Sequence, residues 1–445
     1  MSLTKVSNVM IKGAPANVLD YGAYNDGTHE TETTVAIQNA LDSGAKTIYV
    51  PKGTYLFTTL TIPEKVSLVG EGSANTILQT STASNAITFN GTYNTQIKGL
   101  AINQTGSIQG KGLYLIEQYF VTLIDVTVTG FQYNLYAEKA LYHYVSECKF
   151  ENGTYGAYYT GSGTSWNIDW FNNVLTFQNC RFNGNATIGA YIKGCEVVFE
   201  NCDWSGMSAT NSIGLKVEGV NTSNYAHGIQ IIQPYAETTD IIFSFSYAFV
   251  EINGGFVQGG TSSGTSAATS IIDADNYSSI FWKGRPRDSD YWDYGYRITN
   301  NSSLWWDWLG FSTSVRASNT VDATSSVAYG QALGTWTATL NGCTTLPTVT
   351  ASYSISGKQV TINIPANNAT SNSTGCTVTG LPTFLYPIAT QVGYVSVFDT
   401  GAEYQGTISL TTSGVLTIYK GAYGGIFTNS GVKGHRPITF TYLLN

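Results

Sequence analysis

Apolar and polar side chains alternate in short runs along the first half of the chain, with Gly and Asn between the runs. Two of these runs, 177–183 (FQNCRFN) and 199–205 (FENCDWS), are copies of one pattern set 22 residues apart. Repetition at twenty-odd residues with a two-residue alternation is typical of stacked β coils. We therefore expect a β-solenoid.

Related runs continue the repeat upstream, at residues 97–103, 123–129 and 145–151. Steps of 22 residues indicate bare coils, and longer steps indicate coils with an inserted loop. Side chains alternate across a strand, so every second residue of each run faces the interior. The expected interior columns are Val126, Cys148, Cys180 and Cys202, and beside them Val128, Phe150, Phe182 and Trp204.

The rest of the chain follows other patterns. Residues 33–42 are typical of a short amphipathic helix that could cover the open end of the first coil. From residue 334 onward, alternating segments are separated by Gly, Asn and Pro turns, which is typical of a β-sandwich. We expect an all-β chain with a parallel β-helix over residues 18–310, a connector over 311–330 and a β-sandwich over 331–445.

Composition narrows the function classes. Charged residues make up only 11% of the 445 residues, against about 25% in typical soluble domains, which suggests extensive surface buried between chains. A net charge of −8 argues against a nucleic-acid partner. No apolar run is long enough for membrane insertion, and no secretory h-region follows Met1. The six Cys residues show no metal-ligand spacing, so we expect no metal and no cofactor.

Several segments resemble a known family. Residues 18–27 (VLDYGAYNDG), 34–41, 48–55 and 68–72 together resemble the opening of pectate-lyase-like right-handed parallel β-helix proteins. The stretch from Leu3 to Ala23 is similar to the start of bacteriophage tailspike proteins. Gly334-Thr335-Trp336 and residues 437–442 resemble the C-terminal sandwich modules of phage tail fibres and spikes.

The resemblance implies a homotrimeric part of the virion tail, made in the host cytoplasm. Residues 1–17 would then be the virion-proximal segment that joins the phage tail or baseplate. The implied partner is a bacterial surface polysaccharide, either capsule or O-antigen, which such proteins bind and usually cleave at the cell surface. Fold alone does not assign this chemistry, which depends on the individual side chains of the site.

Two outward carboxylates, Asp125 and Glu147, are expected side by side on neighbouring coils about 4.8 Å apart. Such a pair matches the spacing of a retaining glycosidase, with Glu147 as the acid and Asp125 as the nucleophile. The competing interpretation is a solvated polar face neutralised by Lys149 and Arg181. The reserve catalytic candidates are Glu151, Asp169 and Asp203.

The coil between residues 153 and 173 carries a loop insertion rich in aromatic residues. Sugar rings stack on flat aromatic side chains, so this loop is a candidate sugar groove; it could equally pack against a neighbouring subunit. Lys149 and Arg181 are the cations expected beside the substrate. The aromatic residues expected to bind substrate are Tyr155, Tyr158, Tyr159, Trp166 and Trp170.

Two alternatives to hydrolysis stay open. A polysaccharide lyase acting by β-elimination would need a base and a cation, which Tyr142, His143, Lys149 and Arg181 could supply. No cluster of Asp of the kind used by calcium-assisted lyases occurs on the repeat, so hydrolysis is favoured. The third possibility is a receptor-binding spike that does not cleave its glycan.

Overall fold

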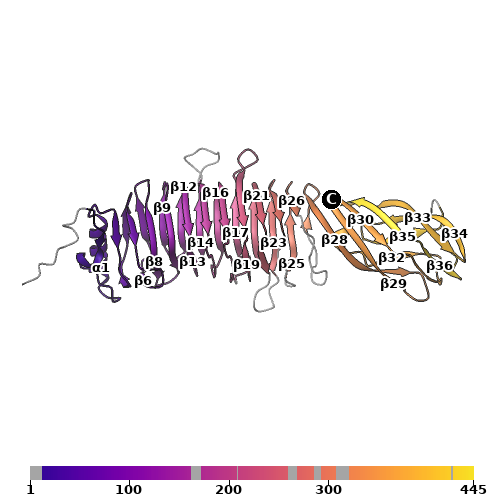
Figure 1. The fold of residues 1–445 in the computed structure, drawn as a ribbon, viewed down its shortest axis with the longest axis horizontal. Helices are drawn as coiled ribbons and strands as arrows, with labels where there is room; N and C mark the ends of the chain where they lie inside the picture. Colours follow the sequence, from indigo (N-terminus) through magenta and orange to yellow (C-terminus); the bar gives the residue numbers. More distant parts are fainter. Residues whose placement is uncertain are drawn as a thin grey trace, which may run out of the picture. The chain divides into compact units, whose positions relative to one another are not determined.

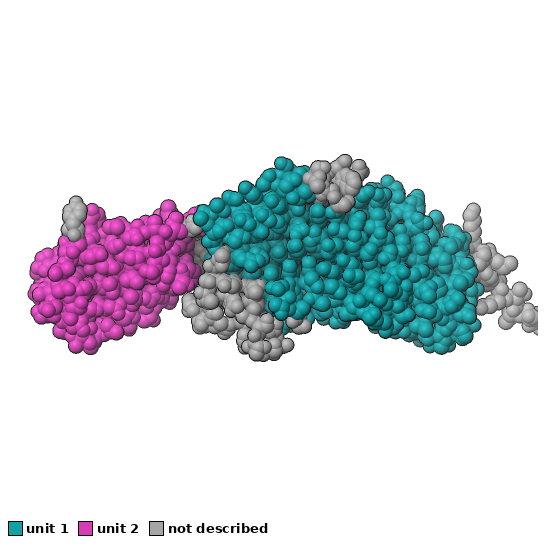
Figure 2. Space-filling model, turned by 180° about the vertical axis from the view of Figure 1, so that it is seen from behind, with its two compact units in different colours: residues 1–302, 314–324 teal, residues 303–313, 325–445 magenta. Residues whose placement is uncertain are grey.

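The structure is a computed structural model that describes residues 13–161, 172–207, 209–258, 268–284, 292–306, 320–421 and 424–444. These residues form an all-β chain with a parallel β-solenoid of about nine turns, followed by an antiparallel curled sheet, which confirms the expected fold class (Figure 1). The chain divides into two compact units, residues 1–302 with 314–324 and residues 303–313 with 325–445 (Figure 2). No helix in the described ranges is long and apolar enough to cross a membrane.

Each coil of the solenoid contributes to three parallel faces. In one coil, β12 (Leu141–Ser146) lies on face 1, β13 (Lys149–Glu151) on face 2 and β14 (Tyr155–Thr160) on face 3. The preceding β10 (Thr122–Thr129) pairs with β12 before its bend and with β13 after it. In the next coil, β15 (Asn172–Gln178) pairs with β12 on face 1, and β16 (Ile188–Glu200) pairs with β14 on face 3.

The remaining elements of the first unit follow the same winding. They are β1 (Ala16–Asn17), η2 (Val18–Tyr21), β2 (Thr47–Tyr49), β3 (Gly53–Leu56), β4 (Leu60–Pro63), β5 (Ser67–Val69), β6 (Thr76–Thr80), β7 (Asn85–Asn90), β8 (Gln96–Gln104), β9 (Lys111–Ile116), β11 (Tyr133–Glu138), β17 (Ile213–Glu218), β18 (Ala226–Ile232), β19 (Tyr235–Glu237), β20 (Ile241–Ser246), β21 (Ala248–Asn253), β22 (Phe256–Gln258), β23 (Ala268–Asp275), β24 (Ser279–Lys283), β25 (Trp292–Ile298) and β27 (Thr320–Val321).

The interior columns agree with the alternation read from the sequence. All eight side chains from Val126 to Trp204 in the two columns have no exposed area. Phe182 stacks between Phe150 and Trp204, with ring centroids 5.8 Å from each. The three cysteines of the first column remain free thiols, in keeping with their place as small apolar side chains in a packed interior.

The corners between faces are made by single residues with left-handed backbone. Between faces 1 and 2 these are Gly99, Asp125, Glu147, Asn179 and Asn201, with φ between 50° and 65°. The corner between faces 3 and 1 is made in the same way. Gly and Asn suit this conformation, whereas a bulky side chain is strained in it. Each coil therefore changes direction at a fixed position of the repeat.

A helix lies at the N-terminal end of the solenoid (Figure 1). This helix, α1 (Glu30–Leu41), overlaps residues 33–42, where the sequence indicates one, and begins three residues earlier. It buries Ala36, Ile37 and Ala40. The amide of Gln38 donates to the Thr61 carbonyl and accepts from the Thr61 N–H, at 3.0 and 2.9 Å, so the helix is tied to β4.

The second unit is antiparallel, apart from its first strand, β26 (Ser303–Trp306), which pairs in parallel with the start of β28 (Ser326–Asn341). Its strands β28, β29, β30 and β37 pair in that order, and β33 pairs with β34 and β36, so the expected sandwich is found as one sheet curled around an apolar interior. Its elements are β26 (Ser303–Trp306), β28 (Ser326–Asn341), β29 (Thr348–Gly357), β30 (Gln359–Ile364), β31 (Asn367–Thr370), β32 (Thr377–Thr379), η3 (Thr383–Leu385), β33 (Gln391–Asp399), β34 (Ala402–Leu410), β35 (Leu416–Tyr419), β36 (Val432–His435) and β37 (Ile438–Leu443).

Candidate functional site

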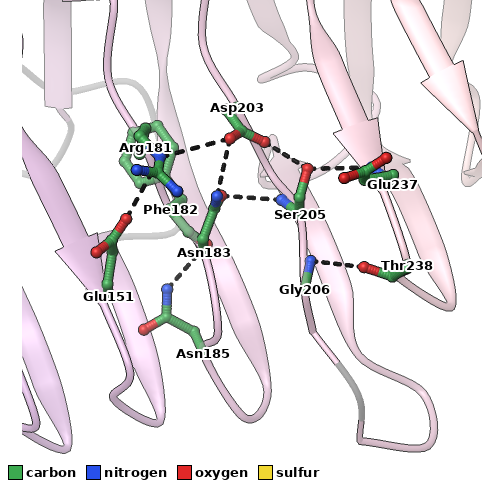
Figure 3. A network of polar contacts seen from close by, with 10 residues as sticks. All are labelled: Glu151, Arg181, Phe182, Asn183, Asn185, Asp203, Ser205, Gly206, Glu237 and Thr238. Atoms are coloured by element: carbon green, nitrogen blue, oxygen red, sulfur yellow. Dashed lines mark hydrogen bonds and ion pairs between the residues drawn. The ribbon is translucent and has the colours of Figure 1, made fainter. Parts of the chain in front are cut away.

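An acidic cluster lies on face 2 of the solenoid, where three consecutive coils present charged side chains outward (Figure 3). Lys149, Arg181, Asp203 and Tyr235 are paired in register and form one column parallel to the solenoid axis. Glu151 lies two residues after Lys149, in the next outward column. The side chains point outward because the residues between them, such as Phe150 and Phe182, fill the interior.

Arg181 joins two carboxylates of the cluster. Its Nε lies 3.4 Å from Glu151 Oε1 and 3.6 Å from Asp203 Oδ2, so these two oxygens are at most about 7 Å apart. The Glu151 and Asp203 side chains are 19% and 22% exposed, while Arg181 is 49% exposed. The arrangement holds two carboxylates close together at the surface under a cation that can move into solvent.

Asp203 is held at both of its carboxylate oxygens. Asn183 Nδ2 donates to Oδ2 at 2.8 Å, and Ser205 Oγ donates to Oδ1. The Ser205 hydroxyl in turn accepts from the Glu237 N–H at 3.2 Å, which directs its own proton toward Asp203. Ser205 N–H donates to Asn183 Oδ1 at 2.9 Å, so the two partners of Asp203 also fix each other (Figure 3).

Glu151 is held less tightly. Its Oε1 is buried and, within the described residues, makes no hydrogen bond, although it lies near the Arg181 guanidinium. The Arg181 guanidinium compensates the charge of this oxygen, without the close approach of a hydrogen bond. The two acids of the cluster therefore have different surroundings.

An aromatic platform continues the column beyond Asp203. Tyr235 is exposed, and its ring stacks on Phe256 of the next coil with centroids 4.9 Å apart. Desolvation, helped by the neighbouring Glu237, raises the pKa of Tyr235. Arg181 and Tyr235 belong to the coils on either side of Asp203, so their backbones are roughly 10 Å apart at ~4.8 Å per coil.

The pair of carboxylates that the sequence favours for catalysis, Asp125 and Glu147, lies outside the acidic cluster, at the corner between faces 1 and 2. Asp125 accepts hydrogen bonds from Ser73, at 3.1 Å from its N–H and 2.6 Å from its hydroxyl, and so holds the loop of an earlier coil. Glu147 is exposed at the corner between faces 1 and 2. Both residues have left-handed backbone, which the strand alternation used to place them does not take into account.

The substrate-binding candidates are spread over the molecule. Tyr155 and Tyr158 lie outward on face 3, where Tyr155 stacks on Tyr133 at 4.8 Å and Tyr158 on Tyr191 at 4.6 Å. Lys149 stands in the column of the acidic cluster, beside Arg181. Trp166, Asp169 and Trp170 lie outside the described residues.

Tyr159 and His143 lie in the interior. Tyr159 has no exposed area, and its hydroxyl is 3.2 Å from His143 Nδ1. His143 Nε2 is 2.9 Å from the Gln118 carbonyl oxygen, and burial lowers the pKa of His143 to about 4. Neither side chain can contact a glycan at the surface, and we leave both out of the proposed site.

The sequence reasoning missed Tyr235, Phe256 and Glu237. A signal existed, because Tyr235 follows Asp203 at the same 32-residue step that separates Cys148 from Cys180. Extending the repeat by this longer step predicts that Tyr235 lies next to Asp203 on the following coil. Among the described residues, no three His, Cys, Asp or Glu side chains are grouped so as to hold a metal ion.

Residues 16–230 match the family model described as rhamnogalacturonase A/epimerase, pectate lyase-like. The match covers slightly less than half of the chain, and it agrees with the solenoid architecture and with the pectate-lyase-like resemblance that the sequence indicates. A search of curated proteins found no match.

Solved structures share the fold at low sequence identity. The enzymatically active domain of bacteriophage CBA120 tailspike protein 2 is 11% identical with a TM-score of 0.53, over 98% of this chain and 83% of that one. ORF18 of Geobacillus virus E2 is 15% identical with a TM-score of 0.51, over 96% and 76%. The Azotobacter vinelandii mannuronan C-5 epimerase AlgE4 A-module is 16% identical with a TM-score of 0.45, over 70% and 97%.

Proposed function

We propose that this protein is a phage tailspike that binds a bacterial surface polysaccharide, capsule or O-antigen, and depolymerises it by glycosidic hydrolysis at the acidic cluster. The observation that carries the proposal is the approach of Glu151 and Asp203 to the same Arg181 nitrogen, beside the exposed ring of Tyr235. The pectate-lyase-like match and the fold shared with a tailspike's enzymatically active domain support it.

The two carboxylates take different roles in the proposed reaction. Asp203, fixed at both oxygens, acts as the carboxylate that attacks the anomeric carbon or activates a water molecule. Glu151, whose Oε1 lacks a hydrogen bond, gives its proton to the glycosidic oxygen that leaves. A limit of about 7 Å between the nearest oxygens is compatible with either stereochemical course.

Arg181 has to release the carboxylates when substrate arrives. Its side chain is half exposed, and ion pairs of this kind contribute at most about 1 kcal/mol. A sugar ring stacked against Tyr235 can therefore displace the guanidinium, which remains close enough to bind a hydroxyl or acidic group of the glycan.

A lyase is the second candidate function, and one observation favours it. Lys149 and Arg181 are cations on adjacent coils of the same column. Such a pair could neutralise the carboxylate of a uronic acid while its neighbouring proton is removed. The two reactions differ in their products, because β-elimination leaves a carbon–carbon double bond that absorbs in the ultraviolet and hydrolysis does not.

The test is incubation of the full chain with capsular and O-antigen polysaccharides from a bacterial panel, followed by mass spectrometry and ultraviolet absorbance. Saturated oligosaccharides support the hydrolase, unsaturated ones the lyase, and retention without products a receptor-binding spike. For the hydrolase, Glu151→Gln and Asp203→Asn should each lower kcat about 100-fold or more. Glu147→Gln, on the adjacent corner, is the matched control; a comparable loss in that variant would return the acid role to Glu147.

The wider biological setting belongs to the same proposal. The protein would be a homotrimer in the virion tail, joined to the tail or baseplate through its N-terminal residues 1–17. The sparse charge of the chain supports extensive contact between copies.

A further inference from the structure

Exposed aromatic residues follow one corner of the solenoid, the corner between faces 3 and 1. Successive coils place Asn94, Phe120, Tyr142, Val174 and Glu196 at the same position of this corner, as the pairing of the adjoining residues shows. Aromatic side chains at this position or within three residues of it define what we call the aromatic edge. Its members are the exposed Tyr93, Phe120, Tyr142, Phe249 and Tyr277 and the half-buried Tyr225.

Phe120 and Tyr142 are held in a strained backbone conformation. Both have φ of 57°, where a side chain with a Cβ costs roughly 1–2 kcal/mol. The same position is occupied by Asn94 in the preceding coil and by Gly228 further along, with φ of 58° and 66°. The corner can therefore be made by residues that suit it, and the fold does not require aromatic rings there. Val174 and Glu196 occupy the same position with φ of 54° and 53°, so the strain belongs to the corner, and the exposed rings are what distinguish Phe120 and Tyr142.

The rings are also exposed. Phe120 is 45% and Tyr142 50% exposed, and their rings are parallel with centroids 4.7 Å apart. Tyr93 stacks on the far side of Phe120 at 6.5 Å. This stack of three rings ends at Tyr142, because the next coil has the much smaller Val174 at this position. The face of the Tyr142 ring that is turned away from Phe120 therefore has no aromatic partner at this corner position.

A second group of rings continues the edge several coils further. Tyr225 lies 4.7 Å from Phe249, and Tyr277 stacks near Tyr247 at 6.4 Å. From the coil of Tyr93 to that of Tyr277 there are seven steps, or roughly 34 Å at ~4.8 Å per coil. A row of this length fits an extended polymer better than a small ligand.

We propose that the aromatic edge is a second, non-catalytic binding site for a linear polysaccharide, whose sugar rings contact the aromatic side chains along the solenoid axis. Pyranose C–H groups pack on aromatic rings, and the neighbouring Glu117–Lys139 ion pair offers polar partners for hydroxyl groups. The edge joins faces 3 and 1, whereas the acidic cluster lies on face 2, so the two sites are separate. The identity of the ligand class rests on the proposed function.

The test compares full-length variants by affinity electrophoresis in gels that contain each polysaccharide of the bacterial panel. All are made in the Glu151→Gln/Asp203→Asn background so that the gel is not digested. Phe120→Asn/Tyr142→Asn should weaken retention about tenfold or more. Because Asn tolerates the left-handed corner, as Asn94 does, the thermal midpoint of this variant should be equal or higher. Val174→Asn at the same corner position is the matched control and should retain wild-type affinity.

The outcomes separate this proposal from the catalytic one. The proposal would be overturned if Phe120→Asn/Tyr142→Asn left retention unchanged, or if none of the polysaccharides retained the Glu151→Gln/Asp203→Asn protein with its aromatic edge intact. A change of oligomeric mass in that variant would also overturn it, since the rings would then lie between copies of the chain. If the Glu151→Gln/Asp203→Asn protein still cleaves polysaccharide while Phe120→Asn/Tyr142→Asn weakens retention, the catalytic role of the acidic cluster is contradicted. The binding role of the aromatic edge is then supported.

Discussion

His143 shows what a single buried residue contributes in this solenoid. Both of its ring nitrogens have partners, Tyr159 and the Gln118 carbonyl, and the ring is kept neutral by burial, which lowers its pKa to about 4. In the unfolded chain the same side chain titrates near 6.5. Between these values the unfolded state binds the extra proton, so stability is fully present above pH 6.5 and is lost as the pH falls toward 4.

This difference predicts a pH-dependent stability of about 3 kcal/mol from His143 alone. His143→Gln removes the titration and leaves a side chain that can still donate to the Gln118 carbonyl. The thermal midpoint of the wild type should fall more steeply between pH 7 and 4.5 than that of the variant, as measured by differential scanning calorimetry. Parallel curves would show that His143 is accessible to protons in the folded state.

Ser205 is the residue that positions Asp203. Ser205→Ala removes the donor to Oδ1 and should lower kcat about tenfold with KM little changed, since a hydrogen bond to a charged group is worth about 1.5 kcal/mol or more. Ser205→Thr keeps the hydroxyl and should recover most of the rate. Equal losses in both variants would indicate a packing defect at this site, and the pH profile of kcat should shift only in the Ala variant.

At the scale of the coil, the corners decide which strand positions can serve a site. Asn179 makes the corner between faces 1 and 2 with φ of 53° and is exposed. Asn179→Val should cost roughly 1–2 kcal/mol because a β-branched residue is strained there, whereas Asn179→Gly should be nearly neutral. Thr176→Val, at an outward strand position of β15, is the matched control. Chemical denaturation of the three variants measures the difference, and equal stability of the Val and Gly variants would contradict it.

The same corners explain where sequence reasoning stopped. Strand alternation located the interior columns through Cys180 and Trp204 and the outward charges Arg181 and Asp203. It treated Asp125 and Glu147 as strand residues, although each occupies a left-handed corner. A residue's φ is not visible in an alternating pattern, so the direction of these carboxylates could not be predicted. The bonds of Ser73 to Asp125 also join residues 52 positions apart, which no local pattern contains.

At the scale of the whole molecule, face 3 carries a column of tyrosines in register, flanked by Lys111 and Lys216. Tyr114, Tyr136, Tyr158 and Tyr191 stand on four consecutive coils, with ring centroids between 4.6 and 5.8 Å apart. Burial raises the pKa of Tyr158 and of Tyr191 even within one chain. We expect this face to contribute to contacts between copies in the proposed homotrimer.

Light scattering should therefore give the wild-type protein three times the 47.9 kDa mass of one chain. Tyr158→Arg should shift that mass toward a single chain, because an unpaired charge buried in an aromatic contact costs several kcal/mol in each of three interfaces. Tyr142→Arg introduces the same charge on the aromatic edge and should leave the mass unchanged. A single-chain mass for the wild-type protein would contradict the proposed homotrimer. A trimeric Tyr158→Arg variant would instead place the contacts between copies on another face, and the tyrosines of face 3 would then be free to bind glycan.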